Sequence, residues 1–156
     1  MKEKILEAFR DLGFKLEEEE GMGYCFNYEG LNLLYMYNEN DEEFLNIALP
    51  GIVEVEEDRM LQICALLEKI NSTLKYVKTY MLGNSVWLFY ERELFGEEDL
   101  MTVISRMILH LEAGLVFARK AMAEIEETMT NGSSNDTTDG AEEIATEEIT
   151  DDEDNE

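Results

Sequence analysis

Two different spacings of apolar residues in the first half of the chain predict one helix followed by four strands. Helical spacing is seen at Ile5, Leu6, Phe9 and Leu12, so a first helix is expected over about 2–12. Short apolar or alternating runs bounded by turn residues then predict four strands. These strands are expected at 14–18, 24–28, 31–37 and 44–49. Glu29-Gly30 indicates a tight hairpin, and Pro50-Gly51 is expected to end the fourth strand.

The next segment predicts a second helix and a second hairpin. The helix is expected over about 57–71, and its apolar stripe is assigned to Leu61, Cys64, Leu67 and Ile70, widened by Ile63 and Leu66. Strands are expected at 74–81 and 85–91 around Gly83-Asn84. The nearly continuous apolar run at 86–90 is typical of a strand in the interior of a sheet.

A third and much longer helix is the strongest pattern in the chain. It opens with acidic residues at 97–99, which suit the positive end of a helix dipole. Two heptad series follow, formed by Met101, Ile108, Leu115 and Met122 and by Ile104, Leu111, Ala118 and Ile125. The stripe is broad in the first half and narrow in the second. The second half is therefore expected to pack over the sheet edge, against the first helix, or on another chain.

Together these segments predict an α+β domain with two layers. The expected order is α-β-β-β-β-α-β-β-α, with an antiparallel sheet of five to six strands and helices packed on it. This domain is expected to occupy residues 1–129. Residues 130–156 contain a Gly, Ser, Asn and Thr linker and then an acidic stretch, so they are expected to form a disordered acidic tail.

The charge of the chain narrows its partners. The formal net charge is −25, of which the 11 acidic residues of 128–156 contribute −11 and the rest of the chain −14. Such a charge repels nucleic acid and anionic membranes and favours basic or apolar-patched proteins. Solubility alone is the competing explanation of the acidity.

The search for chemistry finds no catalytic, cofactor or metal motif, so an enzyme is not expected. His110 is the single histidine, and no second ligand stands at metal-binding spacing. Cys25 and Cys64 are interpreted as small apolar core residues in a reducing compartment. A charged N-terminus without an apolar stretch, and the lack of an apolar run of membrane-spanning length, favour a cytoplasmic location.

Aromatic residues gather in the predicted strands, among them Tyr24, Tyr35, Tyr80 and Trp87. If three helices cover one face of the sheet, the other face is free to present tyrosines to solvent or to a partner. The alternative is ordinary strand composition, because aromatic residues favour strands in general.

Five segments carry a resemblance to a known family. They are KILEAFRDLGF, YEGLNLLYMYN, EDRMLQICALLEKIN, TLKYVKTYMLGNSVWLFYE and EEDLMTVISRMILHLEAGL, within about residues 2–127. With their element order and low isoelectric point, they resemble the YbjN-like domain family, whose fold is shared with type III secretion chaperones. The resemblance implies a small cytoplasmic protein, often dimeric, that acts by binding other proteins and has no catalytic residues.

The resulting hypothesis is a non-enzymatic protein-binding domain with a chaperone-like or regulatory role. Its candidate partner-binding residues are Leu115, Met122, Ile125, Leu61 and Leu67. One alternative is a regulator that binds a small ligand between the sheet and the third helix. Another is an acidic mimic of nucleic acid that occupies the basic site of a second protein.

Overall fold

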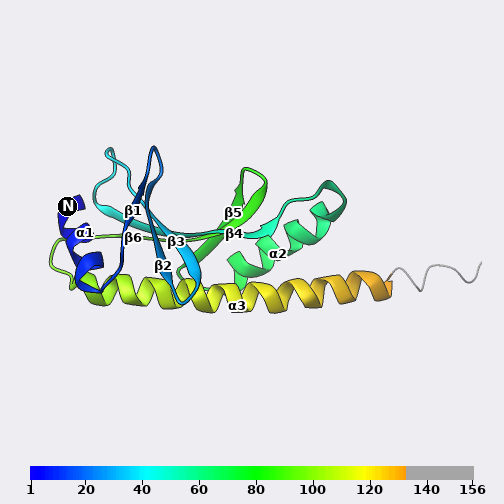
Figure 1. The fold of residues 1–156 in the computed structure, drawn as a ribbon. Helices are drawn as coiled ribbons and strands as arrows, with labels where there is room; N and C mark the ends of the chain where they lie inside the picture. Colours follow the sequence, from blue (N-terminus) through cyan, green and yellow to red (C-terminus); the bar gives the residue numbers. More distant parts are fainter. Residues whose placement is uncertain (133–156) are drawn as a thin grey trace, which may run out of the picture.

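The computed structural model describes residues 1–132 and shows a six-stranded antiparallel sheet with three helices against one face (Figure 1). The strand order across the sheet is β1-β2-β3-β4-β6-β5, so β1 and β5 are the edges. The α+β class and the predicted element order are confirmed. The elements are α1 (Lys2–Asp11), β1 (Glu17–Glu19), β2 (Gly23–Tyr28), β3 (Leu31–Met36), β4 (Phe44–Glu54), the short 3₁₀ helix η1 (Glu57–Arg59), α2 (Met60–Thr73), β5 (Val77–Leu82), β6 (Ser85–Glu93) and α3 (Leu100–Gly132).

Both predicted hairpins form, and backbone conformation explains their turn residues. Glu29 and Gly30 have φ values of 47° and 84°, the left-handed pair that a two-residue hairpin turn requires. Gly83 in the β5–β6 turn has φ of 61°. Gly23 is needed for a different reason, since a Cβ there would lie 2.0 Å from the carbonyl oxygen of Tyr35. The lack of a side chain at Gly23 therefore lets β2 pack closely against β3.

The expected end of the fourth strand at Pro50-Gly51 is wrong, because β4 continues through both residues to Glu54. β4 pairs with β6 at Leu49↔Leu88 and resumes at Val53↔Val86, with a register shift in between. Four steps along β4 therefore match two along β6, and the pair Pro50-Gly51 lies in this bulge. A bulge accommodates proline, which has no N–H to donate to the ladder.

The first strand is shorter than expected, since β1 covers only Glu17–Glu19 and not 14–18. Gly13 has φ of 86° and turns the chain after α1. Phe14 then packs in the core, with its ring 6.1 Å from that of Phe9 and 5.1 Å from that of Phe26. Core packing of this one side chain therefore replaces the start of the predicted strand.

The assignment of the apolar stripe of the second helix is correct for Ile70 and for the widening residues Ile63 and Leu66, and wrong for Leu61 and Cys64. The buried residues of α2 are Ile63, Leu66 and Ile70. Leu61 and Cys64, which were expected to lead the stripe, are exposed, with Leu61 at 71%. The helix is rotated so that the three isoleucine and leucine side chains reach the core, because they bury more apolar surface there than a cysteine would.

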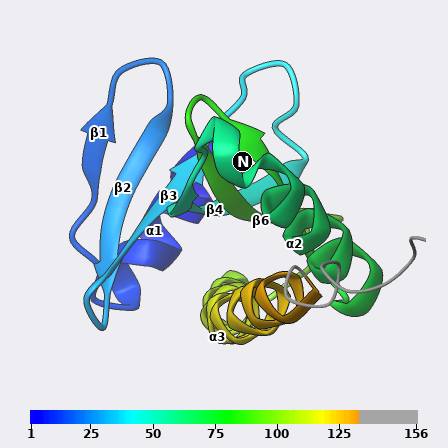
Figure 2. The same cartoon turned by 90° about the vertical axis from the view of Figure 1, so that its right-hand side faces the viewer.

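α3 runs along the sheet beneath β4, β5 and β6, with α1 against its beginning and α2 beside its C-terminal half (Figures 1 and 2). The second half of α3 therefore packs on α2 and on the end of β4. Packing on α2 was not among the three possibilities inferred from the sequence. Arg59, at the start of α2, forms an ion pair with Glu126 of α3. The buried residues of α3 extend from Val103 to Met122.

α3 is also long and apolar enough to cross a membrane by length and composition alone. Its most apolar window has a mean hydropathy of 1.5, and 39% of that window is buried within the structure. The expectation that no segment reaches this length is therefore wrong. Packing beneath the sheet accounts for the apolar residues that face the core.

The predicted acidic tail lies outside the described residues, apart from its first three positions, 130–132, which continue α3. Its disorder stays a prediction.

Candidate functional site

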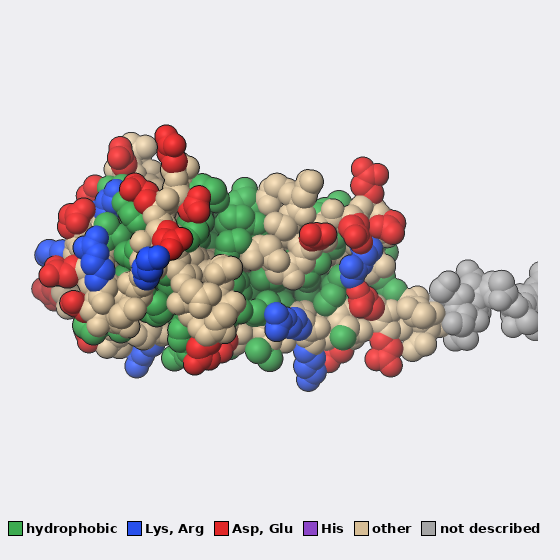
Figure 3. Space-filling view, in the orientation of Figure 1, with side chains coloured by type: hydrophobic (Ala, Val, Ile, Leu, Met, Phe, Trp, Pro, Cys, Tyr) green, Lys and Arg blue, Asp and Glu red, His purple; other side chains and the backbone are tan. Residues whose placement is uncertain are grey.

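The face of the sheet that carries no helix holds a row of side chains across all six strands. Antiparallel register aligns them in the order Glu17, Cys25, Leu34, Ala48, Phe89 and Lys78. The central members of this row are buried although no helix lies over them. Neighbouring side chains on the same face cover them. Figure 3 shows hydrophobic side chains gathered in the hollow between the β1–β2 turn and the β5–β6 hairpin.

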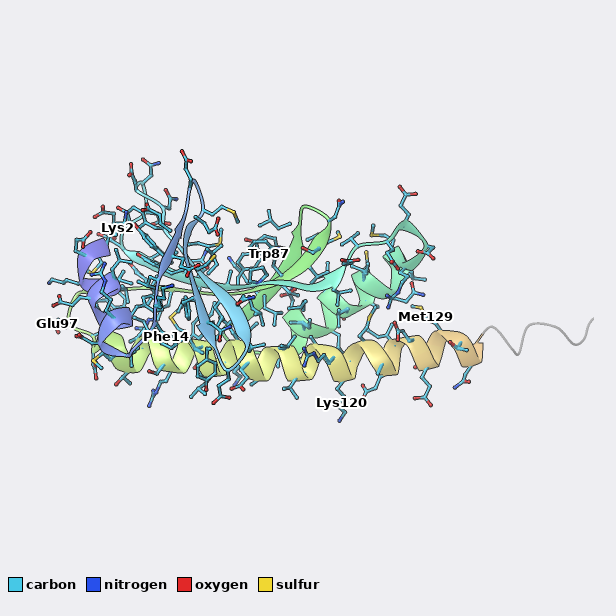
Figure 4. The ribbon with its side chains drawn as sticks, in the orientation of Figure 1. Lys2, Phe14, Trp87, Glu97, Lys120 and Met129 are labelled. Atoms are coloured by element: carbon cyan, nitrogen blue, oxygen red, sulfur yellow. The ribbon has the colours of Figure 1, made fainter. Side chains whose placement is uncertain are left out.

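An aromatic stack lies on this helix-free face over β5 and β6, at one side of the sheet. The ring of Tyr80 lies 4.1 Å from that of Phe89 with an interplanar angle of 3°. Trp87 lies on the other side of Phe89, at 6.0 Å and 15°, and its indole N–H donates to the Ser85 hydroxyl at 2.8 Å. Tyr80 keeps a large exposed surface. In Figure 4 Trp87 is on the side of the sheet away from α3. Phe89 is fully buried and Trp87 is half-buried, so Tyr80 is the ring of the stack that is open to a protein partner.

Next to the stack, the same face contains a pocket of about 360 Å³. It is enclosed by the β1–β2 turn, the β3–β4 loop and the ends of β3, β4 and β6. The amide nitrogen of Asn46 donates to a carboxylate oxygen of Glu91 at 2.8 Å, and Lys78 forms an ion pair with Glu91. The lining residues are Gly21, Met22, Met36, Tyr37, Asn38, Asp41, Phe44, Asn46 and Glu91.

The tyrosines are distributed differently from the prediction. Register places Tyr24, Tyr28, Tyr35 and Tyr90 on the helix-covered face, where they belong to the core or pack against it. Tyr35 is fully buried, and burial raises its pKa well above the usual range. The helix-free face is aromatic mainly through Phe44, Tyr80, Trp87 and Phe89, so its partner-facing character does not rest on tyrosine alone.

The predicted partner-binding residues are divided among three places. Leu115 and Met122 are 6% and 8% exposed and line a groove of about 220 Å³ between α3 and the end of β4. Ile125 lines a separate groove of about 340 Å³ between α2 and α3. Leu61 is exposed on α2, and Leu67 is half-buried. The structure therefore does not bring these five residues together into one surface.

In Figure 4 Met129 faces the α2 side of α3 and Lys120 points to the opposite side. Met129 lines the groove between α2 and α3, whereas Lys120 lines neither groove. The groove between α3 and β4 corresponds to the predicted small-ligand position between the sheet and the third helix.

The remaining candidate residues have structural surroundings. The Nδ1–H of His110 donates to the carbonyl oxygen of Arg106 at 2.6 Å, and the His110 ring packs edge-on against Tyr76 and Tyr90. Within residues 1–132, no group of three or more His, Cys, Asp or Glu side chains could hold a metal ion. These contacts show no chemistry for His110 beyond packing.

The interpretation of both cysteines as core residues is wrong. Cys64 is exposed on α2, and Cys25 is half-buried on the helix-free face. Burial, followed by the nearby carboxylates of Glu19 and Glu17, raises the pKa of the Cys25 thiol. Cys64 was misplaced for the same reason that the α2 stripe was misplaced, namely an ambiguous phase of apolar residues.

Comparison with solved structures identifies the fold. The structure of YbjN from E. coli, a proposed transcription regulator, aligns with a TM-score of 0.59 at 14% identity, over 77% of this chain and 92% of YbjN. The chain has a YbjN-like fold. A second neighbour is an uncharacterized protein from Methanothermobacter thermautotrophicus, with a TM-score of 0.53 at 17% identity over 81% of this chain and 97% of that protein. No protein-family model and no curated protein matches the sequence.

The fold resemblance inferred from the five sequence segments is thereby confirmed. At these identities the likeness concerns the fold, so the functional argument rests on the surface of this chain.

Proposed function

We propose that this chain is a non-enzymatic, cytoplasmic protein-binding domain with a regulatory or chaperone-like role, and that the helix-free face of its sheet is the binding surface. The observation that carries the proposal is the exposed ring of Tyr80, stacked on the buried ring of Phe89, beside a pocket on the same face whose lining includes the exposed side chains of Met22 and Phe44. Large apolar side chains that stay exposed together on one face mark interaction sites more often than scattered ones do.

The edges of the sheet are less suitable for binding an added strand. β1 is three residues long, and all three are glutamates. Short, charged edge strands disfavour pairing with another chain. The face of the sheet is therefore the larger continuous surface available to a partner. The acidity of the chain supports a protein partner over nucleic acid or an anionic membrane.

The test compares two tagged variants with the unmodified protein in pull-downs from native cell extract, read by quantitative mass spectrometry. Tyr80→Arg removes the stacked ring from the helix-free face. Val116→Arg is the matched control, because Val116 is 64% exposed on α3. Partners retained by Val116→Arg and lost by Tyr80→Arg support the proposal.

The reverse pattern, with binding lost only in Val116→Arg, would contradict the use of this face. A small molecule that co-purifies with the protein and contacts Leu115 and Met122 would instead support the ligand-binding alternative at the groove between α3 and β4. Release of a captured DNA-binding protein by added DNA would support the nucleic-acid mimic.

A further inference from the structure

The pocket on the helix-free face combines apolar walls with carboxylate hydrogen-bond acceptors. Its walls include the side chains of Met22, Met36 and Phe44. Asp41 and Glu91 add carboxylates to the lining, and the lining contains no lysine or arginine. A pocket with this lining suits a ligand that has an aliphatic stem and a cationic end.

Asn46 supplies a further acceptor at the base of the pocket. Because its amide nitrogen donates to the Glu91 carboxylate at 2.8 Å, the opposite amide orientation would place two oxygens against each other. The side-chain oxygen of Asn46 is thus fixed as the second polar atom. It is buried and has no hydrogen-bond donor within residues 1–132. A buried acceptor without a donor costs about 1–3 kcal/mol. Because almost none of the surface of this oxygen is open to solvent, a ligand donor reaches it only after the side chains around it shift.

The charges around the pocket reinforce this preference. Glu91 is already shared with Lys78, whereas the Asp41 side chain has no hydrogen bond or ion pair to another residue of the described part. Strand register also places Glu19 and Glu93 on this face, opposite Gly23 and Phe44. The rim is therefore acidic, and a second copy of this acidic chain would be repelled from it.

We propose that this pocket receives the side chain of an arginine or lysine from a basic segment of the partner protein, while apolar residues of the same segment contact the Tyr80–Phe89–Trp87 stack. The proposal rests on the proposed function of the helix-free face and specifies the chemistry of its partner. Methionine side chains adapt to an inserted aliphatic stem. Arginine fits best, because its five donors can serve the carboxylates of Asp41 and Glu91 together.

The primary test is an NMR titration of the full chain with Nα-acetyl-L-arginine N-methylamide. The expected shifts are confined to the Asn46 side-chain amide and to the methyl groups of Met22 and Met36. The neutral citrulline analogue, which has nearly the same shape, is expected to leave them unchanged. Equal shifts with both compounds, or arginine shifts elsewhere on the protein, would overturn the proposal.

Asp41→Asn is the matched variant. The backbone of Asp41 bonds to Asn38 and Phe44 in the loop, and the substitution leaves these bonds in place. Loss of one exposed carboxylate is expected to weaken arginine binding about fivefold, the equivalent of about 1 kcal/mol. Unchanged arginine affinity in Asp41→Asn, or the absence of the expected shifts in the wild type, would reject the pocket.

The same variant separates this proposal from the broader one. In the pull-down, loss of partners in both Tyr80→Arg and Asp41→Asn supports both proposals. Loss in Tyr80→Arg alone keeps the helix-free face as the binding surface and refutes the cation pocket. Retention of all partners by Tyr80→Arg refutes the proposed function itself.

Discussion

The side chain of Asn71 binds both backbone groups of Thr79 on the outer edge of the sheet. Its amide oxygen accepts from the Thr79 N–H at 2.8 Å, and its amide nitrogen donates to the Thr79 carbonyl oxygen at 2.9 Å. Thr79 lies in the middle of β5, the edge strand, and is buried. The carboxamide thus occupies the position that a further strand would take, and α2 closes the β5 edge at its centre.

Removal of this contact is expected to destabilise the protein. Asn71→Ala leaves a buried N–H and a buried carbonyl without partners, which lowers the free energy of unfolding by about 2 kcal/mol. Urea denaturation followed by circular dichroism measures the change. Ser72→Ala is the control, because the neighbouring Ser72 hydroxyl makes only a 3.4 Å contact to the Lys69 carbonyl. Equal stability of the two variants would show that water hydrogen-bonds to the Thr79 backbone in place of the Asn71 amide, with no loss of unfolding free energy.

Thiol reactivity distinguishes the two cysteines. Cys64 is exposed, whereas Cys25 is half-buried and has a raised thiol pKa caused by burial and by Glu19 and Glu17. Because the thiolate is the reactive form, we expect Cys64 to react with a disulfide reagent much faster than Cys25 at neutral pH. Single-thiol variants, Cys25→Ser and Cys64→Ser, give the two rates. Equal native rates would place both thiols in similar surroundings, contrary to the structure.

The start of α3 is expected to depend on pH through Glu98. The N–H groups of Phe95 and Gly96 donate to its two carboxylate oxygens at 2.7 and 2.9 Å, and these bonds hold the pKa of Glu98 below its ordinary value. A lowered folded-state pKa gives stability that is present above the unfolded pKa and lost as pH falls through the folded pKa.

Glu98→Gln should therefore flatten the acid limb of the stability curve between about pH 5 and pH 3. Thermal melts across that range provide the measurement. Glu97→Gln is the control, because the Glu97 side chain makes no hydrogen bond or ion pair with another residue within 1–132. A slope in Glu98→Gln as steep as in the control would contradict this origin of the pH dependence.

The core position of the far half of α3 predicts the result of charged substitutions there. Leu115 and Met122 are almost completely buried, so Leu115→Glu combined with Met122→Glu places two carboxylates in the core. At about 3 kcal/mol or more each, the loss approaches the whole stability of a domain. We expect an unfolded product by circular dichroism.

The matched control for this pair is Leu109→Glu combined with Val116→Glu, on exposed positions of the same helix. A folded double mutant at 115 and 122 that passes from dimer to monomer in light scattering would restore the interface predicted from the heptads.

Features set by neighbouring residues could be predicted from the sequence. Glu29-Gly30 and Gly83 form turns because their backbone conformations are local preferences of these residues. The heptad pattern likewise predicts the single long helix α3. In α2, seven apolar residues stand within ten positions, so two overlapping stripes fit equally well. Only tertiary packing chooses between them, and it buries Ile63 while it exposes Leu61.

The candidate pocket could not be predicted for a related reason. Its lining comes from a turn, a loop and three strands that are distant in sequence, and Glu91 meets Asn46 only through β4–β6 register. The bulge at Pro50 depends on the same pairing. From the sequence alone, a proline indicates the end of a strand, because the pairing with β6 that creates the bulge around Pro50 cannot be read from it.

The position of α3 under the sheet affects how the chain folds while it is being synthesised. Side chains of α1 and of every strand except β1 belong to the core that α3 completes, yet α3 is the last element of residues 1–132 to leave the ribosome. Until it emerges, a nascent chain holds the apolar face of its sheet open. Productive folding therefore waits for the last quarter of the domain, and a stalled or shortened product is the form most exposed to aggregation.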